Sequence, residues 1–184
     1  MIDQLLIKYA SPTLGGIKTG NLFKICNDNK FDLHEEIKNY NLLLNYLNLY
    51  LVIVYSCDRY SLIYIYRLEM LLNDLKNEEV CCFLKSYGYD FTSIEDYITH
   101  LKYRFELLKS TPHEIGVFLG YPLNDVKCFI QFKGKNFKIS GCWKVYDNVN
   151  YCSKKFDSFK KYRAILSYLY KNDYPLESLI FNGL

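Results

Sequence analysis

Apolar residues that recur every three or four positions predict most of the secondary structure of this chain. On this basis we expect helices over residues 2–9, 31–48, 68–75, 78–87, 93–110, 123–132 and 151–170. Two of these helices begin with the residue pair of a capping box, Asp32 with Glu35 and Ser93 with Asp96. We expect the first helix to end at Pro12, because proline disrupts a helix interior, and the glycine-rich segment 13–20 to form a loop.

Runs rich in β-branched and aromatic residues predict the strands. Residues 50–57 and 60–67 are two such runs, and the short junction between them predicts a β-hairpin over 50–67. Further short strands are expected near residues 21–26, 115–119 and 141–146. Together these elements predict an α+β fold, in which a small, partly antiparallel sheet is covered by several helices. Because the chain has no internal repeat, low-complexity tract or linker, we expect a single domain over 1–184.

Composition is that of a globular protein: half of the residues are apolar and 17% are aromatic, among them 19 tyrosines. The longest apolar run, 49–55, is far shorter than the roughly 20 residues that a membrane helix needs. The N-terminus carries Asp3 and lacks the basic and apolar regions of a secretory signal. The seven cysteines include no C-x-x-C pair, which favours reduced thiols over a redox pair or a zinc knuckle. We therefore expect a cytoplasmic protein without membrane contact.

Positive charge is concentrated between residues 127 and 171, where Asp147 and Asp157 are the only acids. Aromatic residues are interleaved with these lysines, a pattern that suits nucleic acid, since cations contact phosphates and rings stack on bases. Lysines on a helix are equally typical of a solvated face, and the acidic remainder of the chain balances them. Binding of an anionic partner to segment 127–171 is therefore an alternative to a plain solvated surface.

The pair His113–Glu114 resembles half of the H-E-x-x-H motif of zinc proteases. The second histidine is replaced by Val117, so no metal site is predicted. His113 remains a candidate general acid or base. The segment 15–19 lacks the glycine that a phosphate loop places before its lysine, although the loop and Lys18 could still bind an anion.

Three blocks of sequence carry a family resemblance: SPTLGGIKTGNLF (11–23), PHEIGVFLGYPLNDVKCFI (112–130) and GCWKVY (141–146). They resemble an uncharacterised family of bacterial proteins, a domain of unknown function found mainly in anaerobic low-GC Gram-positive bacteria. The pattern matches at Ser11, Pro12, Thr13, Leu14, Gly16, Lys18, Asn21, Leu22, His113, Glu114, Gly116, Phe118, Leu119, Gly120, Tyr121, Pro122, Asp125, Val126, Gly141, Trp143, Lys144, Val145 and Tyr146. Where relatives tend to carry Cys and Gly, this chain has Ala10 and Cys128, and the first departure weakens any thiol mechanism there. The resemblance implies a cytoplasmic, single-domain bacterial protein and no particular activity.

We expect the three blocks to converge on one cleft that binds a small anionic or aromatic ligand, because their residues lie in loops, where function usually resides. The predicted lining residues are Lys18, His113, Glu114, Tyr121, Trp143 and Lys144. Two alternatives stay open: an interaction or nucleic-acid-binding module that uses segment 127–171, and an enzyme that uses His113 as general acid or base. The sequence identifies no cofactor and no oligomeric state.

Overall fold

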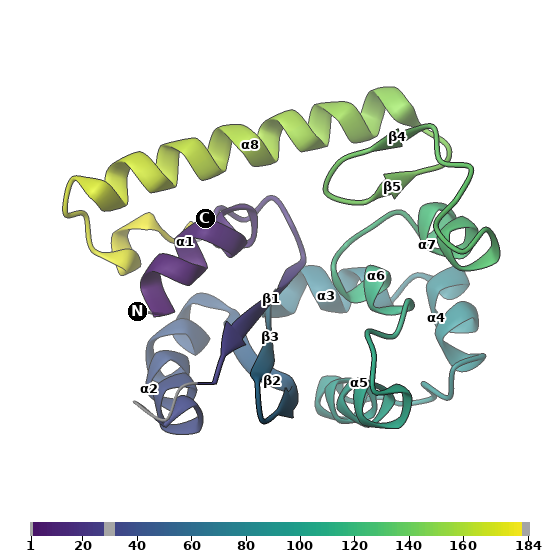
Figure 1. Ribbon diagram of the computed structural model, residues 1–184, viewed down its shortest axis with the longest axis horizontal. Coiled ribbons are helices and arrows are strands. Elements are labelled where there is room, and N and C mark those ends of the chain that lie inside the picture. Colours follow the sequence, from purple (N-terminus) through teal and green to yellow (C-terminus); the bar gives the residue numbers. More distant parts are fainter. Residues whose placement is uncertain (1, 28–31, 182–184) are drawn as a thin grey trace.

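The computed structural model describes residues 2–27 and 32–181, whose arrangement is shown in Figure 1. The helices are α1 (Ile2–Leu14), α2 (Leu33–Leu44), α3 (Leu68–Leu75), α4 (Glu78–Lys85), α5 (Ile94–Leu108), α6 (Ile115–Phe118), α7 (Leu123–Gln131) and α8 (Val149–Lys171). The strands are β1 (Gly20–Cys26), β2 (Leu49–Cys57), β3 (Tyr60–Arg67), β4 (Ile139–Ser140) and β5 (Lys144–Val145). Short 3-10 helices η1 (Asn45–Leu47) and η2 (Leu176–Leu179) follow α2 and α8. The α+β fold class is confirmed.

The main sheet is antiparallel and has the strand order β1-β3-β2. Its β2–β3 pair is the predicted hairpin, and β1 corresponds to the strand predicted near 21–26. Successive side chains of β3 alternate between the two faces of the sheet. Ile63 and Ile65 point into one apolar cluster, whereas Tyr64 and Tyr66 point into another. Both faces are therefore buried.

Helices cover the two faces of the main sheet and give the molecule three layers. On the face of Ile63, α1 and α2 contribute Leu6 and Leu44 to the core, and the C-terminal part of α8 adds Leu166. On the face of Tyr64, helices α3 to α6 supply the packing. The Tyr64 hydroxyl, fully buried, donates a hydrogen bond of 2.6 Å to the carbonyl of Phe118, the last residue of α6. The sheet thereby fixes the position of α6.

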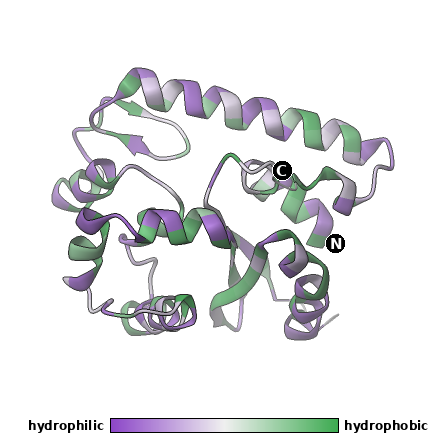
Figure 2. Ribbon diagram, turned by 180° about the vertical axis from the view of Figure 1, so that it is seen from behind, coloured by the Kyte–Doolittle hydropathy of each residue, from purple (hydrophilic) through white to green (hydrophobic). Residues whose placement is uncertain are grey.

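The long helix α8 connects two parts of the fold. In Figure 1 its C-terminal end lies over α1, and its N-terminal end lies over the small β4–β5 sheet. Below that N-terminal end, Phe156 and Phe159 of α8 pack with Trp143 and Val145 in a third apolar cluster. Figure 2 shows apolar and polar residues alternating along α8, as expected for a helix with one buried side.

Two predicted features are wrong. The segment 115–119 is not a strand, because residues 115–118 form helix α6. The first helix does not end at Pro12 but continues to Leu14. Proline removes one helical N–H, yet the last carbonyls of α1 receive tertiary partners, since the buried Arg67 donates to Thr13 and Leu14 at 2.7 and 2.6 Å.

The remaining boundaries agree with prediction within a few residues. Asp32 caps α2 through its side chain, which accepts from the backbone amides of His34 and Glu35, and Ser93 caps α5 by accepting from Asp96. Of the predicted helix 31–48, residue 31 lies outside the described residues, and the rest corresponds to α2 and η1. The extended segment near 141–146 is a strand only over Lys144–Val145. None of the described helices is long and apolar enough to cross a membrane.

Candidate functional site

A pocket of about 370 Å³ lies between α6, α7 and the β4–β5 sheet, and we call it the α6–α7 pocket. Its lining residues are Thr111, His113, Ile115, Gly116, Tyr121, Asp125, Val126, Phe129, Ser140, Gly141, Cys142, Trp143 and Lys144. The volume falls within the range of about 300–1,000 Å³ that is typical of small-molecule sites. All of these residues except Thr111 and Ser140 belong to the second and third sequence blocks.

The shape of α6 places the second block around the pocket. Gly120 has a φ of +72°, and the amides of Gly120 and Tyr121 donate to the carbonyls of Val117 and Gly116 at 2.9 Å each. These two bonds form a Schellman motif, which ends the helix and turns the chain toward α7. Gly116 allows α7 to approach closely, since a Cβ atom there would lie 2.7 Å from Val126. Gly116 and Gly120 thus shape a short helix.

Aromatic rings form one wall of the pocket. Tyr121 and Trp143 stack with their ring centroids 4.7 Å apart, and Trp143 meets Phe156 of α8 edge to face at 4.5 Å. Also in the lining, the His113 ring meets Phe129 edge to face, with the ring centroids 5.1 Å apart. Burial of large rings and paired ring contacts stabilises this arrangement, so the wall is formed before any ligand binds.

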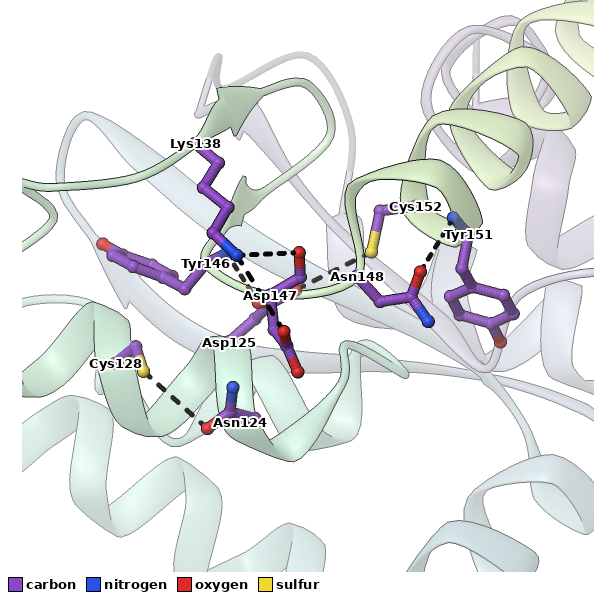
Figure 3. Close-up of polar contacts among 9 residues, drawn as sticks. All are labelled: Asn124, Asp125, Cys128, Lys138, Tyr146, Asp147, Asn148, Tyr151 and Cys152. Atoms are coloured by element: carbon purple, nitrogen blue, oxygen red, sulfur yellow. Dashed lines mark hydrogen bonds and ion pairs between the residues drawn. The ribbon is translucent and has the colours of Figure 1, made fainter.

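Asp125 holds the pocket wall in place from within α7. Its carboxylate is buried and accepts two hydrogen bonds of 2.8 Å, from the indole Nε1 of Trp143 and from the backbone amide of Tyr146. The Cys152 thiol of α8 lies 3.8 Å from the same carboxylate (Figure 3). Burial and the negative charge of Asp125 raise the pKa of Cys152 to about 11, so this thiol stays protonated at neutral pH. One side chain therefore joins α7, the β4–β5 sheet and α8.

Lys144 provides a cation in the lining of the pocket. Its ammonium group donates to the carbonyl of Gly134 at 2.6 Å and lies 4.7 Å from the centroid of the Phe137 ring. A lysine ammonium has three N–H donors, so two remain for a ligand after the bond to Gly134. The contact with Phe137 holds the flexible side chain near the pocket.

Lys18 lies behind the pocket rather than in its lining. The side chain is buried, donates to the carbonyl of Gly20 and places its ammonium nitrogen 5.1 Å from the centroid of the Tyr121 ring. Burial lowers the pKa of Lys18 to about 7, and the positive charges of Arg163 and Lys155 act in the same direction. Through Lys18, Tyr121 and Trp143 the three sequence blocks are in contact.

Glu114 lies outside the pocket. Its buried carboxylate forms an ion pair of 2.7 Å with Arg104 of α5. The adjacent residues His113 and Glu114 therefore face different partners. No hydrogen bond joins His113 to another side chain in the described part of the chain, so the structure supplies no activating partner for it.

Four of the six predicted site residues, His113, Tyr121, Trp143 and Lys144, line one pocket, whereas Lys18 and Glu114 do not. The prediction missed Asp125, Phe129 and Cys142. Helical spacing is the signal that could have found Asp125 and Phe129, because residues four apart on α7 share a face. Within residues 2–27 and 32–181, no group of three or more His, Cys, Asp or Glu side chains is placed to hold a metal.

The aromatic rings of the basic segment include both buried and exposed ones. Trp143, Tyr146, Phe156 and Phe159 are buried in the core, so they cannot stack on bases. The exposed rings of this segment are Phe132, Phe137, Tyr151 and Tyr168. The lysines of α8 lie mainly on its outer side, as in a solvated helix face.

Comparison with other proteins adds a family but no activity. No curated protein and no solved structure is significantly similar to the chain. One family, described as a protein of unknown function (DUF3793), matches residues 6–180. The match spans nearly the whole chain, including all three sequence blocks, and the chain therefore belongs to the DUF3793 family of proteins of unknown function.

Proposed function

We propose that the α6–α7 pocket binds a small, flat, mainly apolar molecule that carries an anionic group. The observation that carries this proposal is the placement of aromatic rings and one available lysine around a single cavity of about 370 Å³. Such a combination, an apolar cavity with few polar groups that fix orientation, is the usual form of a small-molecule site.

The apolar part of the ligand is expected to lie between the ring of Phe129 and the stacked pair Tyr121–Trp143. Flat aromatic ligands gain both from leaving water and from offset or edge contacts with these rings. Because Asp125 fixes Trp143 in the free protein, little ordering of the wall is required on binding, which favours affinity.

The anionic part is expected to contact Lys144. Asp125 also borders the pocket, but both of its carboxylate oxygens already accept N–H bonds from Trp143 and Tyr146. The charge of Asp125 is thereby compensated by donors of the segment around β5. The two remaining N–H donors of Lys144 are then the strongest attraction for a carboxylate or phosphate in this pocket.

The single tryptophan of the chain, Trp143, provides the assay because it lies in the pocket wall. Phenylacetate and its uncharged analogue phenylacetamide are titrated while Trp143 emission is recorded. We expect both to change the emission, and phenylacetate to bind more tightly. Lys144→Gln should weaken phenylacetate by about tenfold, since a charge-assisted hydrogen bond contributes about 1.5–3 kcal/mol, and should leave phenylacetamide unchanged.

Lys138→Gln is the matched control, because Lys138 lies next to β4 but outside the pocket lining. This substitution should change neither titration. The proposal is wrong if neither compound alters Trp143 emission at millimolar concentration, or if Lys144→Gln and Lys138→Gln have equal effects. Equal loss from both lysines, abolished by salt, would instead favour a diffuse anion-binding surface such as the nucleic-acid-binding alternative.

A further inference from the structure

A second pocket, of about 350 Å³, lies between the α3–α4 region, the turn after α6 and the first turns of α8. We call it the α3–α8 pocket. Its polar lining includes Asn73, Asp74, Asn77, Glu79, Tyr151 and Lys155. Tyr121 contributes to both pockets, but the other residues are distinct from those of the α6–α7 pocket.

This pocket is lined by two acids, Glu79, which is exposed, and Asp74, whose position is unfavourable for a carboxylate. Asp74 lies in the last turn of α3, where the negative end of the helix dipole repels negative charge. Burial raises its pKa, and one carboxylate oxygen accepts a hydrogen bond of 2.6 Å from the Thr19 hydroxyl. The other oxygen has no hydrogen-bond donor among the described residues, so Asp74 retains capacity for a cationic or N–H-bearing group.

Lys155 is the base of the same pocket. Its ammonium nitrogen lies 5.1 Å from the centroid of the Tyr151 ring, one helical turn earlier on α8. Lys155 is close enough to lower the pKa of Asp74 in opposition to burial. Yet neither residue forms an ion pair in the described part of the chain, although both face one cavity. Because these two opposite charges border one cavity without pairing, both are available to a ligand.

The remaining wall of the α3–α8 pocket is apolar. Val80 and Val117 are buried, and Leu123 and the ring of Tyr121 extend this surface. A ligand that satisfies the whole pocket therefore combines an ammonium group, a carboxylate and an apolar side chain. From this geometry we infer that the α3–α8 pocket binds a free amino acid with an apolar side chain, its ammonium group at Asp74 and its carboxylate at Lys155.

The inference is independent of the function proposed for the α6–α7 pocket. That pocket offers Lys144 as its cation and no unpaired carboxylate, and it therefore favours anions over zwitterions. A zwitterion gains at the α3–α8 pocket because each of its charges meets an opposite charge in a partly desolvated site, where charge-assisted hydrogen bonds are strong.

The test uses L-leucine and two analogues of the same shape, 3-methylbutylamine, which lacks the carboxylate, and 4-methylpentanoate, which lacks the ammonium group. Binding to the full chain is followed by ¹⁵N NMR at the side-chain amides of Asn73 and Asn77, which line this pocket. We expect L-leucine to shift these amides and each analogue to bind about tenfold more weakly, the loss of one charge-assisted bond.

Substitutions assign each charge to its partner. Asp74→Asn keeps an acceptor for Thr19 and should weaken L-leucine about tenfold without affecting 4-methylpentanoate. Lys155→Gln should weaken L-leucine similarly without affecting 3-methylbutylamine. Lys154→Gln, an exposed neighbour on α8, and Lys144→Gln, in the other pocket, should not change the binding of L-leucine.

Three results overturn the inference: no shift of the Asn73 and Asn77 amides at millimolar L-leucine, equal binding of L-leucine and both analogues, or loss of L-leucine binding in Lys144→Gln. Failure of the α6–α7 pocket to bind phenylacetate leaves the Asn73 and Asn77 readout unaffected. Each of the two proposals can therefore be refuted independently of the other.

Discussion

Replacing Asp125 with asparagine changes one oxygen of a buried carboxylate to an NH₂ group while keeping the size of the side chain. In the native protein the two oxygens of Asp125 accept from Trp143 and Tyr146, each at 2.8 Å. Asparagine has one acceptor oxygen, so one of these two N–H donors must face another donor. Asp125 is only 3% exposed, and water cannot readily replace the lost acceptor.

The expected magnitude follows from these two bonds. A hydrogen bond to a charged acceptor contributes about 1.5–3 kcal/mol, and a buried donor left unpaired costs about 1–3 kcal/mol. These ranges describe overlapping parts of one change, so we expect Asp125→Asn to lower the free energy of unfolding by about 2–4 kcal/mol. That is a large part of the roughly 5–15 kcal/mol that stabilises a typical domain.

Urea unfolding followed by far-UV circular dichroism measures this change without relying on Trp143 emission. We expect a lower urea concentration at the midpoint and an unchanged slope (m value) of the unfolding free energy against urea concentration. Asp147→Asn is the matched control, because the Asp147 side chain is 72% exposed and should change the unfolding free energy by less than about 0.5 kcal/mol.

A double-mutant cycle tests whether the cost of Asp125→Asn comes from its hydrogen bond with Trp143. In a Trp143→Phe background the indole donor is absent, so the asparagine introduced by Asp125→Asn can turn its oxygen to the amide of Tyr146. The added cost of Asp125→Asn should then fall by about 1 kcal/mol or more. If Asp125→Asn costs no more than Asp147→Asn, or if the cycle shows no coupling, Asp125 does not hold the pocket wall as argued.

Three further substitutions probe buried polar groups by the same denaturation assay. Burial lowers the pKa of Lys18 from 10.5 to about 7, so the unfolded chain binds a proton that the folded chain releases; stability should rise from pH 7 to pH 9, and Lys18→Met should remove most of that rise. Glu114→Gln, which breaks the pair with Arg104, should cost about 1–3 kcal/mol, less than a fully buried pair because Arg104 is 18% exposed. Tyr64→Phe should cost about 1–2 kcal/mol, since it leaves the buried carbonyl of Phe118 without its donor.

Exposed residues of the same types serve as controls for these substitutions. Lys102→Met should leave the pH dependence between 7 and 9 intact, because Lys102 is exposed on α5. Glu106→Gln removes an exposed pair with Lys109, and Tyr168→Phe alters a side chain that is 68% exposed, so each should cost less than about 0.5 kcal/mol. A flat pH profile in the native protein, or equal costs in a buried residue and its control, would contradict the corresponding argument.

Local sequence signals were sufficient for most of the fold. The capping residues Asp32 and Ser93 mark helix starts because their side chains accept from the first free amides, as the structure confirms. The β2–β3 hairpin was equally clear, since β-branched and aromatic residues alternate on a sheet with both faces buried. These features depend on neighbours in sequence and can therefore be predicted from it.

The two errors came from long-range contacts and from a short element. Helix α1 passes Pro12 because Arg67, distant in sequence, supplies donors to its last carbonyls. Helix α6 is short, and its apolar run Ile115–Phe118 has no helical period to reveal it. The pair Pro112 and Gly120 was the available signal, because proline favours a helix start and glycine a helix end. Four of the predicted lining residues do line the α6–α7 pocket, but Glu114 pairs with Arg104 of α5, a partner that no local pattern indicates.

Many residues of the three sequence blocks serve the architecture of the fold. Gly116 and Gly120 shape α6, and Asp125 joins α7 to the β4–β5 sheet, so packing and hydrogen bonding explain these residue types. His113 and Lys144 differ: each lines the pocket, and among the described residues the His113 ring forms no hydrogen bond and Lys144 forms a single one, to the carbonyl of Gly134. Lys144→Gln should therefore change the free energy of unfolding by less than about 1 kcal/mol while it weakens the binding of an anionic ligand about tenfold. Asp125→Asn should instead act mainly by lowering the free energy of unfolding. A residue whose substitution affects binding but not stability is one that the fold does not require, and the α6–α7 pocket predicts that Lys144 is such a residue.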